Sequence, residues 1–222
     1  MADNFSELRR AMVDSQVRTT DVTHLPLVEA MLSVPREVFV PVGKRQFAYI
    51  DDDILVSDDG QPRYIMEASP FAKMVQLADI TQDHLVLDVG CATGYSAAVL
   101  SRLAGAVVAL EEDEKLAETA AETLSEHGYD NVDVVTGALV GGHADQGPYD
   151  VIFVGGAVDY VPDALLSQVK ADGRLVVVEG LGLAGVCKLY VRDDEGVVSS
   201  RRAFNLSVRP LPGFAKVAEF TF

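Results

Sequence analysis

The sequence has only two cysteines, no tryptophan and no long apolar run. Cys91 and Cys187 are too few for a disulfide framework, and neither has a second Cys or a His at metal-ligand spacing. We therefore expect a cytoplasmic protein without a bound metal. No apolar stretch approaches ~18 residues, so we expect no membrane-spanning helix and no membrane partner. The opening MADNFSELRR lacks the apolar core of a secretory signal.

Positive charge is also scarce. There are 18 Lys and Arg against 34 Asp and Glu, which gives a net charge of −16. A nucleic-acid backbone is bound by clustered basic residues, and the few clusters here, such as Arg9 with Arg10 or Arg201 with Arg202, are small. We therefore expect no nucleic-acid partner, and we attribute the surplus acid to solubility.

The sequence does contain a regular alternation of short β-branched runs and helical patterns, which predicts parallel βαβ units. Two final strands without a helix between them predict an antiparallel hairpin at one edge. We thus expect an α/β fold with a doubly wound, mostly parallel, seven-stranded sheet. Residues 1–222 are expected to form a single domain, with a helical N-terminal extension over residues 1–80 and the core over residues 81–222. The expected strands are 85–89, 107–110, 132–135, 151–154, 175–178, 186–191 and 203–208.

The N-terminal extension has its own pattern. Residues 4–20 have amphipathic helical spacing, and a second helix is expected near residues 24–33. Residues 34–41 lie between two prolines and are expected to form an extended connector. The acidic stretch 51–61 predicts an exposed loop or short hairpin. A helix capped by Ser69 should follow and lead into the first strand.

The most informative stretch is LVLDVGCATGYSAAVL, residues 85–100. Its apolar run predicts a strand buried on both faces, and the helical spacing from Tyr95 predicts a helix. Gly90 and Gly94 bracket the turn, where glycine permits positive φ and close approach of a ligand. A small ligand is therefore expected at the carboxyl end of the strand. The alternative is a turn packed with small side chains and no ligand.

Acidic residues indicate which ligand this loop binds. A dinucleotide site has the pattern G-x-G-x-x-G, but here only Gly90 is in place, and Tyr95 stands at the third glycine. Asp88 would repel a pyrophosphate by roughly 1 to 4 kcal/mol at contact distance, whereas it would attract an ammonium or sulfonium. Glu111, at the expected tip of the second strand, is placed to accept both ribose hydroxyls, or is a solvated charge at the next helix. The pattern resembles the S-adenosylmethionine (SAM) site of Rossmann-like methyltransferases.

Further segments resemble the protein-L-isoaspartate O-methyltransferase family. They are VEAMLSVPREVFVP (28–41), VLDVGCATGYSAAVLSRLAG (86–105), LSEHGYDNVDVVTG (124–137) and YDVIFVGGAVDYVPDALLSQVKADGRLVVVEG (149–180). The resemblance implies a class I SAM-dependent O-methyltransferase that methylates the side-chain carboxylate of an isoaspartyl residue in damaged protein. Its partner would be a peptide or protein carrying isoaspartate. The cofactor-binding residues that it implies are Asp88, Gly90, Cys91, Ala92, Gly94, Tyr95, Glu111, Glu112, Ala138 and Leu139.

The chain departs from the family pattern in three loops. The family's G-Q-T-I-S, whose hydroxyl residues lie at the acceptor site, is here RYIME, so Tyr64 and Met66 take the hydroxyl positions. The family's G-D-G, whose Asp holds the adenine, is here residues 137–139, so adenine would depend on backbone groups and apolar packing. The family's T-A-A is here residues 155–157, Gly-Gly-Ala, which implies a roomier, less polar floor beneath the methyl group.

Three residues are candidates on the acceptor side: Arg63, Tyr64 and Glu67. Methylation of an ionised carboxylate needs alignment rather than a general base. Arg63 would hold the acceptor carboxylate in bidentate geometry, or is an exposed loop arginine. Glu67 would act as a base toward a neutral amine or hydroxyl acceptor, or pairs with Arg63.

Three functions stay open on these patterns. The first is isoaspartyl methylation, or methylation of another carboxylate or small polar acceptor by a divergent relative. The second is a SAM-binding or interaction module that has lost turnover, which the departures above motivate. The third, a nicotinamide oxidoreductase, is opposed by Asp88 and Tyr95. No pattern in the sequence indicates the oligomeric state.

Overall fold

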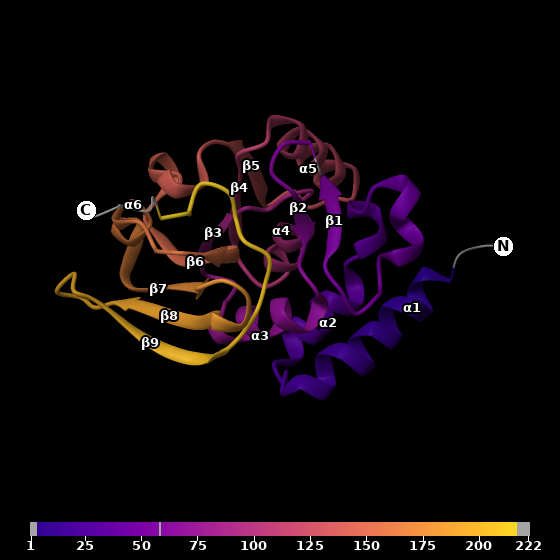
Figure 1. Ribbon diagram of the computed structural model, residues 1–222, viewed down its shortest axis with the longest axis horizontal. Coiled ribbons are helices and arrows are strands. Elements are labelled where there is room, and N and C mark those ends of the chain that lie inside the picture. The colour runs from indigo at the N-terminus through magenta and orange to yellow at the C-terminus, as the bar shows by residue number, and fades with distance from the viewer. Residues whose placement is uncertain (1–3, 58, 217–222) are drawn as a thin grey trace, which may run out of the picture.

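A seven-stranded sheet forms the centre of the molecule (Figure 1). The computed structural model describes residues 4–57 and 59–216. The strands of this sheet are β3 (Leu85–Val89), β4 (Ala106–Glu111), β5 (Val132–Thr136), β6 (Tyr149–Val158), β7 (Val169–Glu179), β8 (Val186–Arg192) and β9 (Val198–Asn205). Their order is β5-β4-β3-β6-β7-β8-β9, with parallel pairing from β5 to β7 and antiparallel pairing of β8 and β9. The expected mostly parallel sheet with an antiparallel hairpin at one edge is confirmed.

The last strand differs from the predicted one in position. Pairing with β8 begins at the turn itself, where Arg192 lies opposite Val198, so the prediction of a strand over residues 203–208 is wrong at both ends. The chain then leaves the sheet and returns to β6, where Pro210 bridges to Ala157. In Figure 1 this yellow C-terminal segment crosses in front of the central strands.

The strand side chains alternate between two core clusters. Val86 and Phe153 face the cluster covered by α3, α4 and α5, whereas Leu87 and Val154 face the cluster that includes α6. The bounds of these helices are α3 (Ala68–Ala78), α4 (Tyr95–Ser101), α5 (Glu114–Glu126) and α6 (Asp163–Ser167). Each fully buried apolar side chain contributes roughly 1.5–3 kcal/mol, which explains why β3 is apolar on both faces.

The N-terminal helices pack on the same cluster as α3. The expected helix over residues 4–20 is one helical path with changing pitch: α1 (Phe5–Met12), a π-helical turn (Val13–Val17) and a 3-10 turn (Arg18–Thr20). The second expected helix is α2 (Leu25–Ser33). Within residues 4–57 and 59–216, no helix is both long enough and apolar enough to cross a membrane.

The prediction of an extended connector over residues 34–41 is wrong. Arg36–Phe39 forms a 3-10 turn that buries both of its end residues. The guanidinium of Arg36 is fully buried and donates to the backbone carbonyls of Ala48 and Met66, at 2.8 Å each. The flanking prolines are compatible with extended backbone, but burial of these two side chains decides the conformation.

The acidic stretch contributes the first strand of a hairpin, but the second strand lies beyond the expected end at residue 61. The two strands, β1 (Ile54–Ser57) and β2 (Arg63–Ile65), make a two-stranded antiparallel sheet separate from the central one. The following helix, α3, begins one residue before Ser69, and its N-cap is Glu67, without a side-chain cap bond. The predicted cap is therefore wrong. The backbone N–H of Glu67 instead donates to Asp53 at 2.9 Å, which ties the start of α3 to the hairpin.

Candidate active site

The loop after β3 has the backbone geometry that its glycines predict. Gly90 has a φ of +86° and Gly94 a φ of +97°, values that side chains other than glycine rarely adopt. Ala92, between them, also has a positive φ of +51°. That conformation costs an alanine roughly 1–2 kcal/mol, so the sequence does not predict it. It directs the N–H of Ala92 to the carboxylate of Glu111, at 2.7 Å.

Asp88 is fully buried just before this loop. Its Oδ2 accepts a hydrogen bond from the Ser96 hydroxyl at 2.6 Å. Its Oδ1 is buried and has no hydrogen-bond partner among residues 4–57 and 59–216. Burial, helped by repulsion from Glu111, raises the pKa of Asp88 to about 7, although Ser96 and Arg63 act in the opposite direction. An unsatisfied buried carboxyl oxygen at the end of a central strand favours a positively charged ligand group.

Glu111 ends β4 and is also fully buried. Its Oε1 accepts hydrogen bonds from the backbone N–H groups of Glu112 (2.9 Å) and Asp113 (3.2 Å), and its Oε2 accepts the one from Ala92. The guanidinium of Arg63 binds both oxygens, Nη1 to Oε1 and Nη2 to Oε2, the latter at 2.8 Å. The carboxylate thus receives five hydrogen bonds.

The position of Arg63 corrects two expectations. Its side chain is 4% exposed, so it is not an exposed loop arginine, and its ionic partner is Glu111 rather than Glu67. Glu67 lies near the acidic residues of the hairpin instead. Partial burial, followed by repulsion from Asp51 and Asp53, raises the pKa of Glu67.

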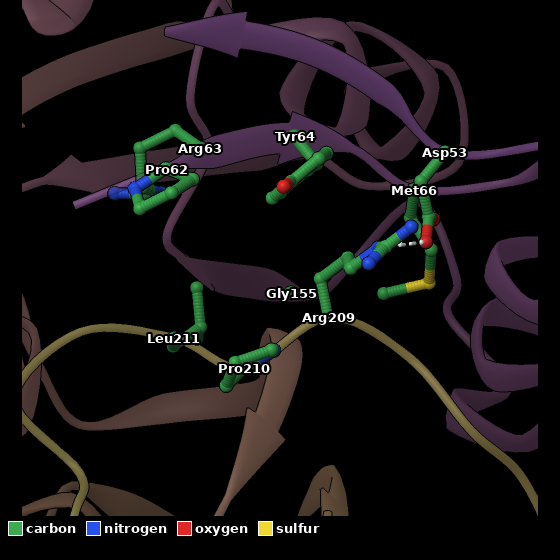
Figure 2. A pocket seen from close by; sticks show the side chains of 9 residues that line it. All are labelled: Asp53, Pro62, Arg63, Tyr64, Met66, Gly155, Arg209, Pro210 and Leu211. Atoms are coloured by element: carbon green, nitrogen blue, oxygen red, sulfur yellow. Dashed lines mark hydrogen bonds and ion pairs between the residues drawn. The ribbon is translucent and has the colours of Figure 1, made fainter. Parts of the chain in front are cut away.

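Two adjoining pockets lie over the loop. The outer pocket lies between the hairpin and the C-terminal segment, and Figure 2 shows its lining. The residues that line it are Asp53, Pro62, Arg63, Tyr64, Met66, Gly155, Arg209, Pro210 and Leu211. The inner pocket is lined by Tyr64, Ile65, Met66, Phe71, Gly90, Cys91, Tyr95, Ser96, Phe153 and Gly155. Tyr64, Met66 and Gly155 are common to both, so the two pockets meet at these residues.

Arg209 supplies a cation to the outer pocket. Its Nε donates to Asp53 Oδ2 at 3.0 Å, and its guanidinium carbon lies 4.9 Å from the centre of the Tyr64 ring. Figure 2 shows the Arg209 side chain extending from the C-terminal segment to Asp53, where the dashed line marks this bond. About half of its side chain (53%) is exposed, so the guanidinium is accessible to an acidic ligand.

The inner pocket contains two other predicted residues. Tyr95 is buried among Phe39 and Phe71, under the guanidinium of Arg36 at 4.5 Å from its ring centre. Its hydroxyl is buried and has no hydrogen-bond partner in the described part of the chain. Burial raises the pKa of Cys91 well above its usual value, so this thiol is a buried apolar group rather than a nucleophile.

One of the three remaining predicted cofactor residues, Glu112, lines a third cavity. This cavity, the acidic groove, is lined by Asp59, Gln61, Arg63, Glu112, Asp113, Pro212 and Gly213. Ala138 and Leu139 are not among the residues that line it: Ala138 is exposed, and Leu139 is buried in the core cluster of α6. Arg63 is common to the acidic groove and the outer pocket and therefore forms the wall between them. No group of three or more His, Cys, Asp or Glu side chains that could hold a metal ion occurs among the described residues.

Arg209 and Leu211 are site residues that the sequence reasoning missed. A Cβ at Gly90 would lie 2.8 Å from the Leu211 side chain and 3.2 Å from Arg63, so the C-terminal segment closes directly over the loop. The available signal was the motif VRPLPG after the last strand, whose two prolines indicate a chain that leaves the sheet.

The sheet order, with acidic residues at the ends of two adjacent strands around a glycine-bracketed loop, defines a Rossmann-like class I methyltransferase fold. The chain belongs to the protein-L-isoaspartate(D-aspartate) O-methyltransferase family, whose model matches residues 7–212.

Curated relatives support this assignment. A protein-L-isoaspartate O-methyltransferase 2 from Nitrosococcus oceani is 37% identical over 187 residues, which cover 84% of each chain. A protein-L-isoaspartate O-methyltransferase from Roseiflexus castenholzii is 34% identical over 210 residues, which cover 95% of this chain and 94% of that one.

Solved structures agree in fold. A protein-L-isoaspartate O-methyltransferase matches with a TM-score of 0.80 and 28% identity, over 92% of this chain and 66% of that one, so the present chain spans about two thirds of its length. A Plasmodium falciparum member solved with S-adenosyl-L-homocysteine matches with a TM-score of 0.76 and 16% identity, over 90% of this chain and 96% of that one.

Proposed function

We propose that the protein transfers a methyl group from SAM to the side-chain carboxylate of isoaspartyl residues in peptides or proteins. The observation that carries the proposal is the meeting of the inner and outer pockets at Tyr64, Met66 and Gly155, directly over the loop of Gly90. A donor and an acceptor bound in two adjoining pockets are held in the proximity that group transfer requires. Family membership supplies the reaction class.

The residues around the loop fit SAM. The unpartnered Oδ1 of Asp88 would accept the ammonium of the amino-acid part, and the carboxylate of Glu111 would accept the ribose hydroxyls. Gly90, Cys91, Ala92, Gly94 and Tyr95 would line the chain between them. Glu112, Ala138 and Leu139 would lie beside the adenine. SAM supplies a methyl group that its sulfonium has already activated.

The outer pocket is the proposed acceptor site. An isoaspartyl carboxylate is ionised at pH 7, so the pocket has to orient it and exclude water rather than remove a proton. Arg209 would hold the acceptor through charge-assisted hydrogen bonds, with Tyr64 packed beneath its guanidinium. We propose residues 1–80, which include the hairpin, as the substrate-side part of a single domain.

A labelling experiment tests the proposed function. The protein is incubated with methyl-labelled SAM and either an isoaspartyl peptide or the same peptide with normal aspartate. We expect label only in the isoaspartyl peptide. Mild base should release this label, because it hydrolyses methyl esters. Binding of SAM without transfer to the isoaspartyl peptide would rule out this acceptor.

A different acceptor is the second candidate. Tyr64 and Met66 line the outer pocket at positions where the family carries hydroxyl residues, so the pocket offers an aromatic ring and a thioether instead. This lining suits a less polar carboxylate or small acceptor, and for a neutral acceptor Glu67 is the candidate base. Label that appears in a cell extract but not in the isoaspartyl peptide would favour this function.

Replacement of Arg209 tests the acceptor site. Arg209→Met is expected to raise the KM for the isoaspartyl peptide by roughly tenfold, because charged hydrogen bonds contribute about 1.5–3 kcal/mol when partly buried. The value of kcat should change little, and the affinity for SAM should stay the same. Arg201→Met, on the exposed part of β9, is the matched control and should leave both constants unchanged. An unchanged KM in Arg209→Met would remove Arg209 from the acceptor site.

We also propose the cytoplasm as the compartment of the reaction. Both cysteines, Cys91 and Cys187, are buried and free, as is usual where thiols are kept reduced.

A further inference from the structure

We propose that Arg63 and SAM compete for the carboxylate of Glu111, so that SAM releases the Arg63 guanidinium, which then anchors the acceptor carboxylate in the outer pocket. This inference rests on the proposed function and adds an order of binding to it: SAM first, acceptor second. It also assigns Arg63 two successive partners, one before and one after the cofactor binds.

Competition follows from the bonds that Glu111 already makes. Its two oxygens accept three backbone N–H groups and both terminal nitrogens of Arg63. A carboxylate has about four lone-pair positions and this one already receives five donors, so the two ribose hydroxyls can bind only in place of the two Arg63 nitrogens. The backbone donors belong to the loop and to the start of the next helix and stay in place, which leaves Arg63 as the partner that must leave.

Charge also opposes simultaneous binding. The SAM sulfonium and ammonium are cationic, and the site offers them two buried carboxylates, Asp88 and Glu111. In the present arrangement Arg63 neutralises one of these carboxylates and would repel a nearby cation. Release of Arg63 restores the negative charge that attracts the cofactor.

The wall position of Arg63 indicates where its guanidinium goes. It lies between the outer pocket and the acidic groove. On the proposed function the adenosyl group lies against Glu112 and so covers the acidic groove. The outer pocket is then the space that remains for the guanidinium, which lies there beside Arg209. Before the cofactor binds, the outer pocket has one accessible guanidinium, that of Arg209. After Arg63 is released, two arginines can bind the acceptor carboxylate together.

The hairpin gives Arg63 the freedom to move. Arg63 begins β2, and the β1–β2 pair is a two-stranded sheet separate from the central one. Its register shifts between Leu55 and Ser57, just where Ser57 pairs with Arg63. An isolated pair of strands is marginally stable, so a displacement here leaves the central sheet intact.

Chemical modification of the wild-type protein tests the displacement directly. Phenylglyoxal labels accessible arginines, and mass spectrometry locates the label. Arg63 (4% exposed) should be protected in the free protein and become labelled when S-adenosylhomocysteine saturates the site. Arg36, fully buried, should stay protected, and Arg209 should be labelled in both states. Addition of the isoaspartyl peptide should protect Arg63 again, whereas the aspartyl peptide should not.

Variants of Arg63 test the competition. Arg63→Gln should bind S-adenosylhomocysteine roughly tenfold more tightly than wild type by calorimetry, because no part of the population has Glu111 blocked. The same variant should raise the KM for the isoaspartyl peptide. Arg63→Lys, which keeps the charge but lacks the bidentate fork, should bind with intermediate affinity and serves where the glutamine variant does not fold.

The outcomes separate the two proposals. If S-adenosylhomocysteine binds but Arg63 stays protected and its removal does not tighten binding, the competition is wrong while the proposed function stands. Binding to Arg63→Gln alone, and not to wild type, would support the competition in its strongest form. If the ligand binds to neither protein, the proposed function fails and the competition fails with it.

Discussion

Replacing Glu111 by alanine is expected to lower the free energy of unfolding by roughly 3–5 kcal/mol, because it leaves a buried charge without its partner. The side chain of Arg63 is 4% exposed, and its guanidinium pairs with Glu111. The same substitution removes the acceptor for the backbone N–H groups of Ala92, Glu112 and Asp113. Urea unfolding followed by circular dichroism measures the loss. Calorimetry should also show S-adenosylhomocysteine binding at least about 100-fold weaker, since two hydrogen bonds to a charged acceptor are lost.

Two controls make the Glu111 result specific. Glu122→Ala, at an exposed position of α5, should change stability by less than about 0.5 kcal/mol. The double variant Glu111→Gln with Arg63→Met should be more stable than Glu111→Ala, because no charge is then buried alone. A loss below about 1 kcal/mol in Glu111→Ala would mean that the pair does not bury an isolated charge as the structure implies.

The architecture of the sheet was predictable because its signals are local. The apolar runs at residues 85–89 and 151–154 and the helical spacing between the strands each depend on neighbours in sequence, and they predict parallel pairing of the strands. The connector at residues 34–41 was mispredicted for the opposite reason. Its 3-10 turn is set by burial of Arg36 against carbonyls that are 12 and 30 positions away. No local pattern contains those partners.

The residues of the candidate site also divide into those that the sequence predicts and those that it does not. The glycine loop, Asp88 and Glu111 were identifiable because a ligand-binding loop and the ends of its strands follow one another at fixed spacing. The ion pair between Arg63 and Glu111 joins residues 48 positions apart, and Arg209 reaches Asp53 over 156 positions. Side chains brought together only by the path of the hairpin and the C-terminal segment can be found from coordinates but not from periodicity.

Replacing Asp88 by asparagine is expected to remove a pH dependence of stability. The pKa of Asp88 is raised from 3.8 to about 7 in the folded protein, so between these values the folded state binds more protons than the unfolded state. The Asp88 contribution is therefore fully present below about pH 4 and is lost as the pH rises to about 7, by roughly 4 kcal/mol at 1.36 kcal/mol per pKa unit. Asp88→Asn has no such loss and should be the more stable protein at pH 8, with little difference at pH 4.

An ionised Asp88 lowers the stability of the folded protein unless a bound cation neutralises its charge. In the proposed function that cation is the ammonium of SAM, so S-adenosylhomocysteine, which shares the ammonium, should bind more tightly as the pH rises toward 7 and level off above it. Asp88→Asn should bind S-adenosylhomocysteine at least roughly tenfold more weakly and without this pH dependence, despite its greater stability at pH 8.

Methylthioadenosine, which lacks the amino-acid part, should bind wild type and variant alike at every pH. A pH dependence that persists in Asp88→Asn, or that methylthioadenosine shares, would place the titrating group elsewhere. A gain in stability together with a loss of ligand affinity would show that Asp88 is retained for binding rather than for folding.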